Sequence, residues 1–587
     1  MIALTAEQRA AALKDNNVYI SACPGSGKTR VILAKLLAIA DDLQETPFSV
    51  GCITYTNAAV EEIEQRLRQY GNERLTRSTE VMTIHSFCLQ FILRPYRWLV
   101  PEVPHGFKIL SPHTQEFERI VTAVEDEFRR PIGRTTFDDY ASIQIDVDGS
   151  PIGTGIRSGI VTGQSARRYW DFVRAAGFLD FSMILYYSLR ILSEHPFIGK
   201  GISSKFSWLL VDEYQDTTNV QLEILKKIND ASHTKFFLVG DESQSIQGFA
   251  GARIDLANAF VEEIAAATDT PLTGNFRSSR PIVTTAENVI SRTPPMTAIG
   301  PNADVDVEPV YVHCGSAVEA VTDHFLPMLE EHGIPLGKAA VLAPWWQHLV
   351  PIARTLRQFD VPVFGPGARP YKRSRLFASL AEQLGACAES DHLLGLPGVE
   401  RSIFRLLQEA TAQTRFDVFS YKGRCTALSL VYEVRNLAAE FVGGAEWLVQ
   451  AAQRVSTILI ADEWIAEEHR GLLPASANEM LSDMERANVD LENLQIADLG
   501  LFADPDKAIK LITLHNSKGR EFDAVAMVHM NEGQIPNFNA RTDAEFEEAL
   551  RLFYVGTTRP RKILMYASDQ SHRQNRPSRY LLRCNFG

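Results

Sequence analysis

The chain has 587 residues, of which 45% are hydrophobic and 22% charged, a composition typical of several folded domains and not of a disordered chain. No apolar run reaches the ~18 residues that a membrane-spanning helix needs. Residues 1–7 lack the basic and apolar regions of a signal peptide. Seven cysteines without a C-x-x-C pair argue against a structural zinc site and indicate a reducing compartment. We therefore expect a soluble protein of the cytoplasm that does not contact membranes.

The net charge of −13 comes from 59 basic and 72 acidic residues. A basic footprint over the whole chain, as in many proteins that bind nucleic acids, is therefore excluded. A local basic or aromatic surface is still compatible with this sum, because a ligand responds to the nearby field and not to the total charge.

The first predicted strand, residues 18–22, leads into a Gly-rich turn and a helical stretch over residues 31–40. Two more short apolar runs, residues 206–211 and 236–240, are flanked by segments with helical periodicity. Strands that alternate with helices predict an α/β domain with a parallel sheet.

The same pattern recurs later in the chain, where residues 339–343, 508–513 and 524–528 are predicted strands. These strands predict a second α/β domain. Residues 95–200 and about 371–497 have mostly helical periodicity with few strand signals, which indicates two helical insertions.

The strongest local motif follows the first strand and opens its helix. Small residues there let successive backbone N–H groups surround a phosphate, and the helix N-terminus adds positive potential. Lys28 supplies a charge for the β- and γ-phosphates of a nucleotide, and Thr29 offers a hydroxyl to Mg²⁺. Ala22 stands where the general pattern has its first glycine. The predicted phosphate loop consists of Ala22, Cys23, Pro24, Gly25, Ser26, Gly27, Lys28 and Thr29.

Two adjacent carboxylates, Asp212 and Glu213, follow the apolar strand at residues 206–211. The carboxyl edge of a parallel sheet is where α/β proteins bind ligands. Asp212 is suited to hold Mg²⁺, and Glu213 to orient and deprotonate an attacking water. On its own, such a pair of carboxylates is as typical of a solvated strand end as of a catalytic site. Its combination with the phosphate loop favours a catalytic pair.

These residues and several further segments resemble the UvrD/Rep/PcrA-like superfamily 1A DNA helicases, in the family's order and over nearly the whole chain. Motif II, residues 211–216, is almost verbatim. The other matching segments are the glutamine motif (4–8), motif Ia (53–59), motif Ib (83–87), a short segment before motif II (179–181), and motifs III (239–246), IV (272–278), V (513–522) and VI (554–559).

This resemblance implies an α/β fold with two RecA-like parallel-sheet P-loop domains, each interrupted by a mainly helical insertion. The first RecA-like domain, 1A, is expected at residues 1–94 and 179–273, with insertion 1B at residues 95–178. The second, 2A, is expected at residues 274–370 and 498–587, with insertion 2B at residues 371–497.

The resemblance also implies an ATP site. Gln8 is expected to read the adenine edge, Phe276 and Arg30 to lie on the two faces of the base, and Glu521 to accept a hydrogen bond from the ribose. The cofactors are then ATP and Mg²⁺, the latter held by Thr29 and Asp212.

The residues expected to act at the phosphates are Lys28, Glu213, Gln244, Arg277 and Arg559. Gln244 is expected to contact the attacking water and the γ-phosphate. An arginine that neutralises the transferred phosphoryl group accelerates hydrolysis by about 10³–10⁵. The resemblance places Arg277 and Arg559 on the second α/β domain, so that ATP would be bound between two domains whose closure follows its hydrolysis.

A single DNA strand is held by phosphate contacts and by base stacking on aromatic side chains. For the aromatic candidates, packing in the core is the alternative. In the family, motif III usually continues Tyr-x-Trp-Arg, but here the corresponding residues are Gln247, Gly248, Phe249 and Ala250, which puts the strand contacts at this motif in doubt. The candidates are Tyr55, His85, Phe249 and His515 for stacking, and Thr54, Asn57, Ser86, Thr513 and Ser517 for phosphate hydrogen bonds.

Trp345 and Trp346 form a further aromatic cluster directly after a predicted strand. Two interpretations are open, a second platform for base stacking or the start of a helix that packs on the core.

Together these features predict an ATP-dependent 3′-to-5′ helicase or translocase that acts on single-stranded DNA and on junctions of single- and double-stranded DNA, in DNA repair or antiphage defence. The polarity is implied by the resemblance alone. The compact build resembles the helicase subunit of a Gabija-type antiphage system, which implies a nuclease subunit as partner. The alternative is a DNA-stimulated ATPase that serves as the sensor subunit of such a complex and unwinds little. The intact motif residues argue against a catalytically silent scaffold.

Overall fold

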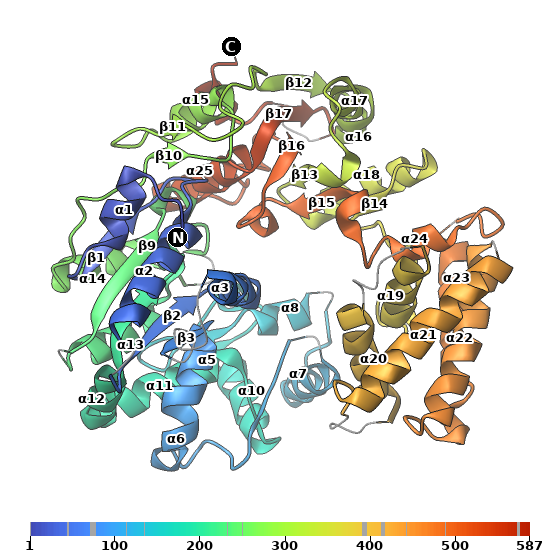
Figure 1. Cartoon of the computed structure of the whole chain (residues 1–587), viewed down its shortest axis with the longest axis horizontal. Helices are drawn as coiled ribbons and strands as arrows, with labels where there is room; N and C mark the ends of the chain where they lie inside the picture. Colours follow the sequence, from blue (N-terminus) through green and yellow to red (C-terminus); the bar gives the residue numbers. More distant parts are fainter. Residues whose placement is uncertain are drawn as a thin grey trace. The chain divides into compact units, whose positions relative to one another are not determined.

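The structure is a computed structural model that describes residues 2–586 except 44–45, 71–77, 113, 134, 232, 249–250, 390–395, 412–416, 442, 488 and 572–575. The chain forms two compact units. Unit 1 contains residues 1–306 and 541–558, and unit 2 contains residues 307–540 and 559–587. Each unit has a parallel sheet and a helix-rich segment (Figure 1).

The sheet of unit 1 has five parallel strands in the order β1-β9-β8-β2-β3. Its side chains alternate between two cores, so that Tyr19 and Leu209 face one and Ile20 and Leu210 the other. Burial on both faces explains why these strands are nearly continuous apolar runs. The strands are β1 (Val18–Ser21), β2 (Ser49–Thr54), β3 (Thr79–Thr83), β8 (Phe206–Val211) and β9 (Lys235–Gly240).

Helices cover both faces of this sheet, and the late helix α25 returns to lie beside α15 although the two are far apart in the sequence (Figure 1). A two-stranded parallel pair, β10 (Gly274–Asn275) and β11 (Thr297–Ala298), precedes and follows α15. The helices are α1 (Ala6–Ala12), α2 (Lys28–Asp42), α3 (Asn57–Tyr70), α11 (Phe181–Glu194), α12 (Pro196–Lys205), α13 (Asn219–Asn229), α14 (Ile254–Glu263), α15 (Arg280–Val289) and α25 (Asp543–Thr557).

The stretch between β3 and α11 is mainly helical and extends one of the two cores of the sheet. Side-chain oxygens start its helices, as when Thr114 accepts from the N–H of Phe117 and Asp180 accepts from that of Met183. Its elements are α5 (Ile84–Phe87), a π-helix (Cys88–Leu93), α6 (Arg94–Tyr96), β4 (Lys108–Ile109), α7 (Gln115–Glu127), α8 (Thr136–Ala141), β5 (Gln144–Ile145), β6 (Pro151–Ile152), α9 (Thr154–Arg157), α10 (Gly163–Ala175) and β7 (Phe178–Leu179).

The sheet of unit 2 has six parallel strands in the order β12-β17-β16-β13-β15-β14. Helices α16 (Ala317–Glu319), α17 (Leu326–Glu331) and α18 (Trp346–Gln358) pack with it, with a π-helix at Ala320–Phe325 between the first two. The strands are β12 (Val310–Cys314), β13 (Ala339–Ala343), β14 (Val363–Phe364), β15 (Ile509–Thr513), β16 (Phe522–Met527) and β17 (Pro560–Asp569).

The rest of unit 2 is a helical bundle, drawn from olive to orange in Figure 1. Trp447 is fully buried at its core, and its indole N–H donates to the carbonyl of Val434. The helices are α19 (Ala378–Glu389), α20 (Leu396–Thr411), α21 (Tyr421–Glu440), α22 (Gly444–Ala461), α23 (Leu472–Arg486) and α24 (Ile496–Gly500). In the part of the chain that the structure describes, no helix is both long and apolar enough to span a bilayer.

The predicted α/β class with parallel sheets and helix-rich segments is confirmed. All six strands predicted from the sequence are present, but the sheet strands β2, β3, β12, β14 and β17 were not predicted. The apolar run of β2 is interrupted by Gly51. A Cβ at this position would lie 2.6 Å from Cδ2 of Leu209 on the neighbouring strand. The four domain ranges expected from the resemblance stay a prediction.

Candidate nucleotide and DNA sites

The candidate residues of unit 1 meet because its sheet is parallel. The carboxyl end of β1 leads into the phosphate loop, β8 into Asp212 and Glu213, and β9 into Asp241. At the same edge, β2 is followed by Tyr55 and β3 by His85. A single edge of one sheet therefore carries the candidate phosphate site and two of the candidate stacking residues.

The phosphate loop depends on two glycines with left-handed backbone, Gly25 at φ 70° and Gly27 at φ 80°. Gly27 directly precedes α2, so the free N–H groups of the first helical turn face the loop. The hydroxyl of Ser26 is buried and has no hydrogen-bond partner among the described residues. An unpaired buried hydroxyl in a loop of inward-facing amides fits a phosphate group, whose oxygens would satisfy it.

The charged groups of the loop and of β8 are paired. Lys28 Nζ lies 3.2 Å from Glu213 Oε1, and the Glu213 N–H donates to Asp212 at 2.9 Å. Burial acts to lower the pKa of Lys28, but the carboxylates of Glu213, Asp241 and Asp212 outweigh it and raise that pKa. Burial, together with the charge of Glu213, raises the pKa of Asp212. A bound cation would relieve this excess of buried negative charge.

Glu213 itself has a left-handed backbone, with φ 49° and ψ 40°. This region is unfavourable for a residue with a long side chain, and such residues concentrate at functional sites. Gln215 fixes the strained turn from both sides, since its amide donates to Glu213 Oε2 at 2.5 Å and its Oε1 accepts from the Asp241 N–H at 2.9 Å. The carboxylate of Glu213 is thus directed toward Lys28 by the backbone and held there.

Gln244 lies in a short turn after β9 and is 4% exposed. Its amide nitrogen donates to Asp241 Oδ2 at 2.5 Å, and Asp241 is fully buried. The structure therefore joins Gln244 to Glu213 and Lys28 through Asp241 and Gln215, in one network of buried polar groups.

Arg277 lies in compact unit 1, close to the phosphate loop, and its expected place in the second α/β domain stays a prediction. The chain passes along the loop before it reaches α15. The N–H of Cys23 donates to the carbonyl of Leu272 at 3.0 Å, and the N–H of Phe276 donates to the carbonyl of Gly25 at 2.9 Å. The Arg277 guanidinium donates to the carbonyl of Thr558 at 3.1 Å.

The residues expected at the nucleotide base have different surroundings. Gln8 is 2% exposed, accepts from the Thr5 N–H at 3.1 Å and donates to the carbonyl of Ser26 at 2.8 Å. Its amide thus ties α1 to the phosphate loop. Arg30 is exposed and Phe276 is half-buried. Contacts of these three side chains to adenine stay a prediction.

Two residues predicted for the nucleotide site belong to unit 2. Arg559 is 1% exposed, and its guanidinium donates to the carbonyl of Arg520 at 3.4 Å. Glu521 forms an ion pair with Arg561 at 2.6 Å. Their contacts to phosphate and ribose also stay a prediction.

A magnesium ion has two candidate protein ligands, the hydroxyl of Thr29 and the carboxylate of Asp212. Both are the hard oxygen donors that Mg²⁺ prefers, and Mg²⁺ usually completes its shell with phosphate oxygens and water. Within the described ranges, no group of three or more His, Cys, Asp or Glu side chains is arranged to hold a metal ion alone.

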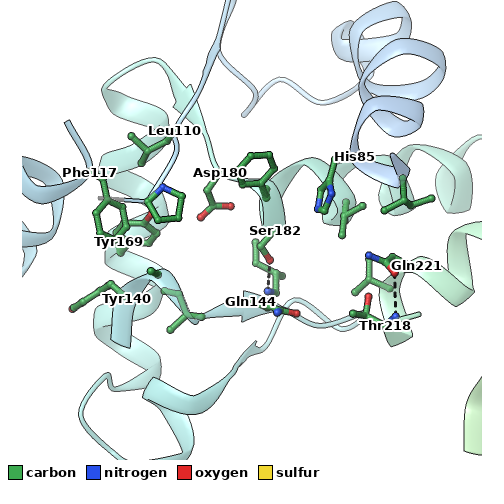
Figure 2. A pocket seen from close by; sticks show the side chains of 18 of the residues that line it. His85, Leu110, Phe117, Tyr140, Gln144, Tyr169, Asp180, Ser182, Thr218 and Gln221 are labelled. Atoms are coloured by element: carbon green, nitrogen blue, oxygen red, sulfur yellow. Dashed lines mark hydrogen bonds between the residues drawn. The ribbon is translucent and has the colours of Figure 1, made fainter. Parts of the chain in front are cut away.

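The stacking candidates of unit 1 border a cavity of about 340 Å³ between the sheet edge and the helical segment (Figure 2). Tyr55 is 46% exposed, and the rings of His85 and Phe181 meet edge to face at 5.2 Å. Burial lowers the pKa of His85 to about 4, so its imidazole is neutral at pH 7. Phe181 is 41% exposed and was not among the candidates, although it lies in the segment that matches the family before motif II.

A small cavity of about 20 Å³ lies behind this one. Tyr55, Ile84 and Gln221 line both cavities, and Asp212 and Glu213 line the small one. In Figure 2, Gln221 is fixed by the hydrogen bond that it accepts from the Thr218 N–H at 3.1 Å. The same three side chains therefore border both the large cavity and the hollow next to the catalytic carboxylates.

The carboxyl edge of the unit 2 sheet carries the remaining candidates. Ala343 of β13 is paired with Thr513 of β15, so Trp345 and Trp346 emerge beside Thr513 and His515. The two tryptophans start α18, but they are 46% and 50% exposed and do not pack into the core. Burial lowers the pKa of His515 to about 4.

The predicted phosphate contacts differ in exposure. Asn57 and Ser86 are exposed, and Thr513 is half-buried. Thr54 is 2% exposed and donates to the carbonyl of Thr56, while Ser517 is fully buried and donates to the carbonyl of Leu514. The last two hydroxyls hold turns of the chain and do not reach the surface along which a strand would pass. Phe249, the fourth stacking candidate, lies outside the described residues.

Comparison with known proteins agrees with this arrangement. Residues 4–265 match the UvrD/REP helicase N-terminal domain, and residues 473–571 match the UvrD-like helicase C-terminal domain. The chain belongs to the UvrD-like helicases. It is 23% identical to the ATP-dependent DNA helicase PcrA of Staphylococcus aureus (strain NCTC 8325 / PS 47), over 98% of this chain and 85% of that protein. It is also 23% identical to the ATP-dependent DNA helicase Rep of Buchnera aphidicola subsp. Schizaphis graminum, over 98% of this chain and 95% of that protein.

In this UvrD-like helicase, a further cation that the sequence did not predict lies beside the candidate nucleotide site. Arg292 follows α15, outside every motif, and its guanidinium donates to Asp241 at 2.5 Å. The two residues are 51 positions apart, and Arg292 lies in no periodic or motif-like pattern. Only the fold brings them together.

Proposed function

We propose that this UvrD-like helicase hydrolyses ATP with Mg²⁺ in order to move 3′ to 5′ along single-stranded DNA and to open junctions of single- and double-stranded DNA, in DNA repair or antiphage defence. Its class is that of an ATP-dependent DNA helicase, as the names of PcrA and Rep state for those relatives. The direction of movement and the cellular pathway are parts of this proposal.

The observation that carries the proposal is the hydrogen-bonded arrangement of half-buried Lys28 and Glu213 with buried Gln244 at one sheet edge. Phosphoryl transfer needs placement and compensating charge more than covalent chemistry from the protein. Lys28 binds the phosphates, Glu213 takes a proton from the attacking water, and Gln244 orients that water. Bound Mg²⁺ would supply further compensation for the phosphate charge.

The strand is proposed to pass over exposed aromatic side chains that follow parallel strands. On unit 1 these are Tyr55 and Phe181 with the neutral imidazole of His85, and on unit 2 they are Trp345 and Trp346. Such stacking is worth about 1–3 kcal/mol per base and tolerates any sequence. This mode of binding suits a chain with a net charge of −13, because it depends less on phosphate attraction.

The second candidate function is a DNA-stimulated ATPase that serves as the sensor of a defence nuclease complex and unwinds little. One observation favours it. Gly248 stands in the altered part of motif III, and a Cβ at this position would lie 2.9 Å from Oε1 of Glu548 on α25. A carboxylate thus approaches the chain where relatives have stacking and cationic residues, and it weakens the attraction of this surface for phosphates.

The experiment that tests the proposal compares three substrates with the full-length chain: a duplex with a 3′ tail, the same duplex with a 5′ tail, and the single strand alone. We expect ATP turnover with all three and strand separation only with the 3′ tail. Single-strand-stimulated turnover without separation of either duplex would favour the sensor function. Turnover that DNA does not change would contradict both. Co-purification of the untagged chain from its own cells tests for a nuclease partner.

A further inference from the structure

Arg292 is a largely shielded cation next to the proposed site of ATP hydrolysis. Its side chain is 11% exposed, and its guanidinium donates to Asp241 Oδ1 at 2.5 Å and to the Ser243 hydroxyl at 3.3 Å. The loop that carries it is held by Glu287, whose carboxylate accepts from the N–H groups of Arg292 at 3.0 Å and Met296 at 2.9 Å. The position of Arg292 is therefore fixed by its own backbone as well as by its ion pair.

The carboxylate of Asp241 connects Arg292 to Gln244. Asp241 is fully buried, and its second oxygen accepts from the amide nitrogen of Gln244 at 2.5 Å. A buried carboxylate that lost its cation would be expensive to keep ionised and would tend to take up a proton. Burial acts to lower the pKa of Arg292, but the negative charge of Asp241 outweighs it and raises that pKa. Arg292 therefore stays protonated and keeps its ion pair with Asp241.

An ionised carboxylate has only acceptor sites, so its neighbour must be a donor. Gln244 can satisfy this demand only by turning its NH₂ group toward Asp241, which turns its carbonyl oxygen to the opposite side. A protonated or absent carboxylate would allow the amide to turn over. The charge on Arg292 thus decides which end of the Gln244 amide faces away from Asp241.

Arg292 also contacts the helix that carries motif VI. Its guanidinium is hydrogen-bonded to Tyr554 of α25, and the Tyr554 hydroxyl lies 3.8 Å from Sδ of Met296. The same helix is tied to motif III by Arg551, which donates to the carbonyl of Ser245 at 2.7 Å. Arg292 is consequently placed between the residues that follow β9 and the helix that leads to Arg559.

We propose that Arg292 is a positioning residue for ATP hydrolysis, which pairs with the carboxylate of Asp241 and thereby directs the carbonyl oxygen of Gln244 toward the attacking water. Gln244 then accepts a hydrogen bond from that water while Glu213 takes its other proton. The role of Arg292 is indirect, because it reaches the water only through Asp241 and Gln244. This inference rests on the proposed ATPase function.

The test is a double-mutant cycle between Arg292 and Gln244, read out as kcat and KM for ATP of the full-length chain with saturating single-stranded DNA. We expect Arg292→Met to lower kcat about 10- to 100-fold, a loss typical of a misplaced catalytic group, with KM changed less than about threefold. Arg292→Lys, which keeps the charge, should recover a large part of the activity. In the Gln244→Ala background, Arg292→Met should lower kcat by no more than about twofold further.

A matched control is Arg130→Met, which removes another arginine from a buried carboxylate of unit 1, Glu125, away from the nucleotide site. Its kcat should stay near that of the wild type, since it loses a similar ion pair without affecting Gln244. If Arg292→Met does not fold, Asp241→Asn provides the second variant. A neutral amide no longer fixes the orientation of Gln244, so the same loss of kcat is expected.

Equal losses of kcat from Arg292→Met with Gln244 present and with Gln244→Ala would overturn the inference, and so would a rise in KM at unchanged kcat. Wild-type activity of both Arg292→Met and Asp241→Asn would overturn it as well. If the wild-type chain itself turned over no ATP, the proposed function would fail and not this inference alone, so the two failures are distinguishable.

Discussion

The carboxyl edges of the two parallel sheets have the same architecture but different chemistry. The edge in unit 1 gathers Lys28, Glu213 and Asp241, which are buried or half-buried and joined to one another directly or through Gln215. The edge in unit 2 presents Trp345 and Trp346, which are about half exposed. Charged groups are costly to bury and stay only where partners fix them, whereas exposed rings cost little and adapt to any base.

This difference shows how one type of sheet serves two tasks. Phosphoryl transfer requires groups that are already in position before the transition state forms, so the edge in unit 1 is a network in which each member holds the next. Holding a strand that must also be released requires weak, repeated and sequence-independent contacts. The two edges therefore predict opposite responses to mutation, large and cooperative at the first, and modest and additive at the second.

The largest effect is expected from the catalytic carboxylate. Glu213→Gln should lower ATP turnover by about 10²–10⁴, the range typical of a general base, and should still bind ATP because the phosphate loop is unchanged. Lys28→Ala should lose both turnover and binding. The measurements are phosphate release and binding of a fluorescent ATP analogue. Glu223→Gln, a half-buried carboxylate of α13 that pairs with Lys226, is the control, and turnover of Glu213→Gln near that of the wild type would contradict the assignment.

A smaller effect is expected at the edge in unit 2. Trp345→Ala and Trp346→Ala should each weaken binding of single-stranded DNA by about 1–3 kcal/mol, roughly 5- to 150-fold in Kd. Fluorescence anisotropy of a labelled oligothymidine measures the Kd. Trp98→Ala removes a more exposed indole, 66% accessible, from the helical segment of unit 1 and should leave the Kd unchanged. Equal Kd values for Trp345→Ala, Trp346→Ala and Trp98→Ala would contradict the assignment of DNA binding to the edge in unit 2.

The rigidity of the phosphate loop can be tested with two glycines of similar backbone. Alanine in the left-handed region costs about 1–2 kcal/mol at either Gly25 or Gly106. At Gly25 the added Cβ would also lie 2.7 Å from Cβ of Arg277, whereas nothing lies within 4 Å at Gly106. Gly25→Ala should therefore be the less stable variant in urea and should raise KM for ATP, while Gly106→Ala should leave KM unchanged. Identical unfolding midpoints would contradict the close contact.

The smallest effect concerns the two buried imidazoles, one at each edge. Burial lowers the pKa of His85 and His515 from 6.5 to about 4, so between pH 6.5 and pH 4 the unfolded chain binds more protons than the folded chain. Stability should fall as the pH drops through this window and be fully present above it. His85→Gln should flatten the dependence of Tm on pH between 5 and 7, and His332→Gln, at an exposed position, should not. An unchanged slope in His85→Gln would contradict the neutral imidazole.

Much of the site in unit 1 could be predicted because its residues follow strands that are visible in the sequence. The phosphate loop after β1 and Asp212 with Glu213 after β8 are such cases. Arg292 could not be found, because its only signal is a partner 51 residues away that the fold alone supplies. The burial of Thr54 and Ser517 could not be predicted either, because the sequence does not distinguish a hydroxyl that caps a turn from one that contacts a ligand.

The position of Arg277 illustrates a different limit. The backbone hydrogen bonds of Cys23 and Phe276 keep this stretch of chain against the phosphate loop, a contact that motif order alone does not predict. Motif order says which residues act together but not which compact unit holds them. Such placement depends on hydrogen bonds between backbone groups, which carry no residue-specific signal.

The left-handed backbone of Glu213 has a consequence for engineering. At φ 49°, glycine or asparagine would be less strained than glutamate, so a selection for heat resistance alone is expected to replace the residue that we propose as the general base. Thermostable descendants of this chain should therefore be sought with position 213 held constant. Stabilising substitutions are better placed at exposed positions of the helical bundle, where stability and ATP turnover do not conflict.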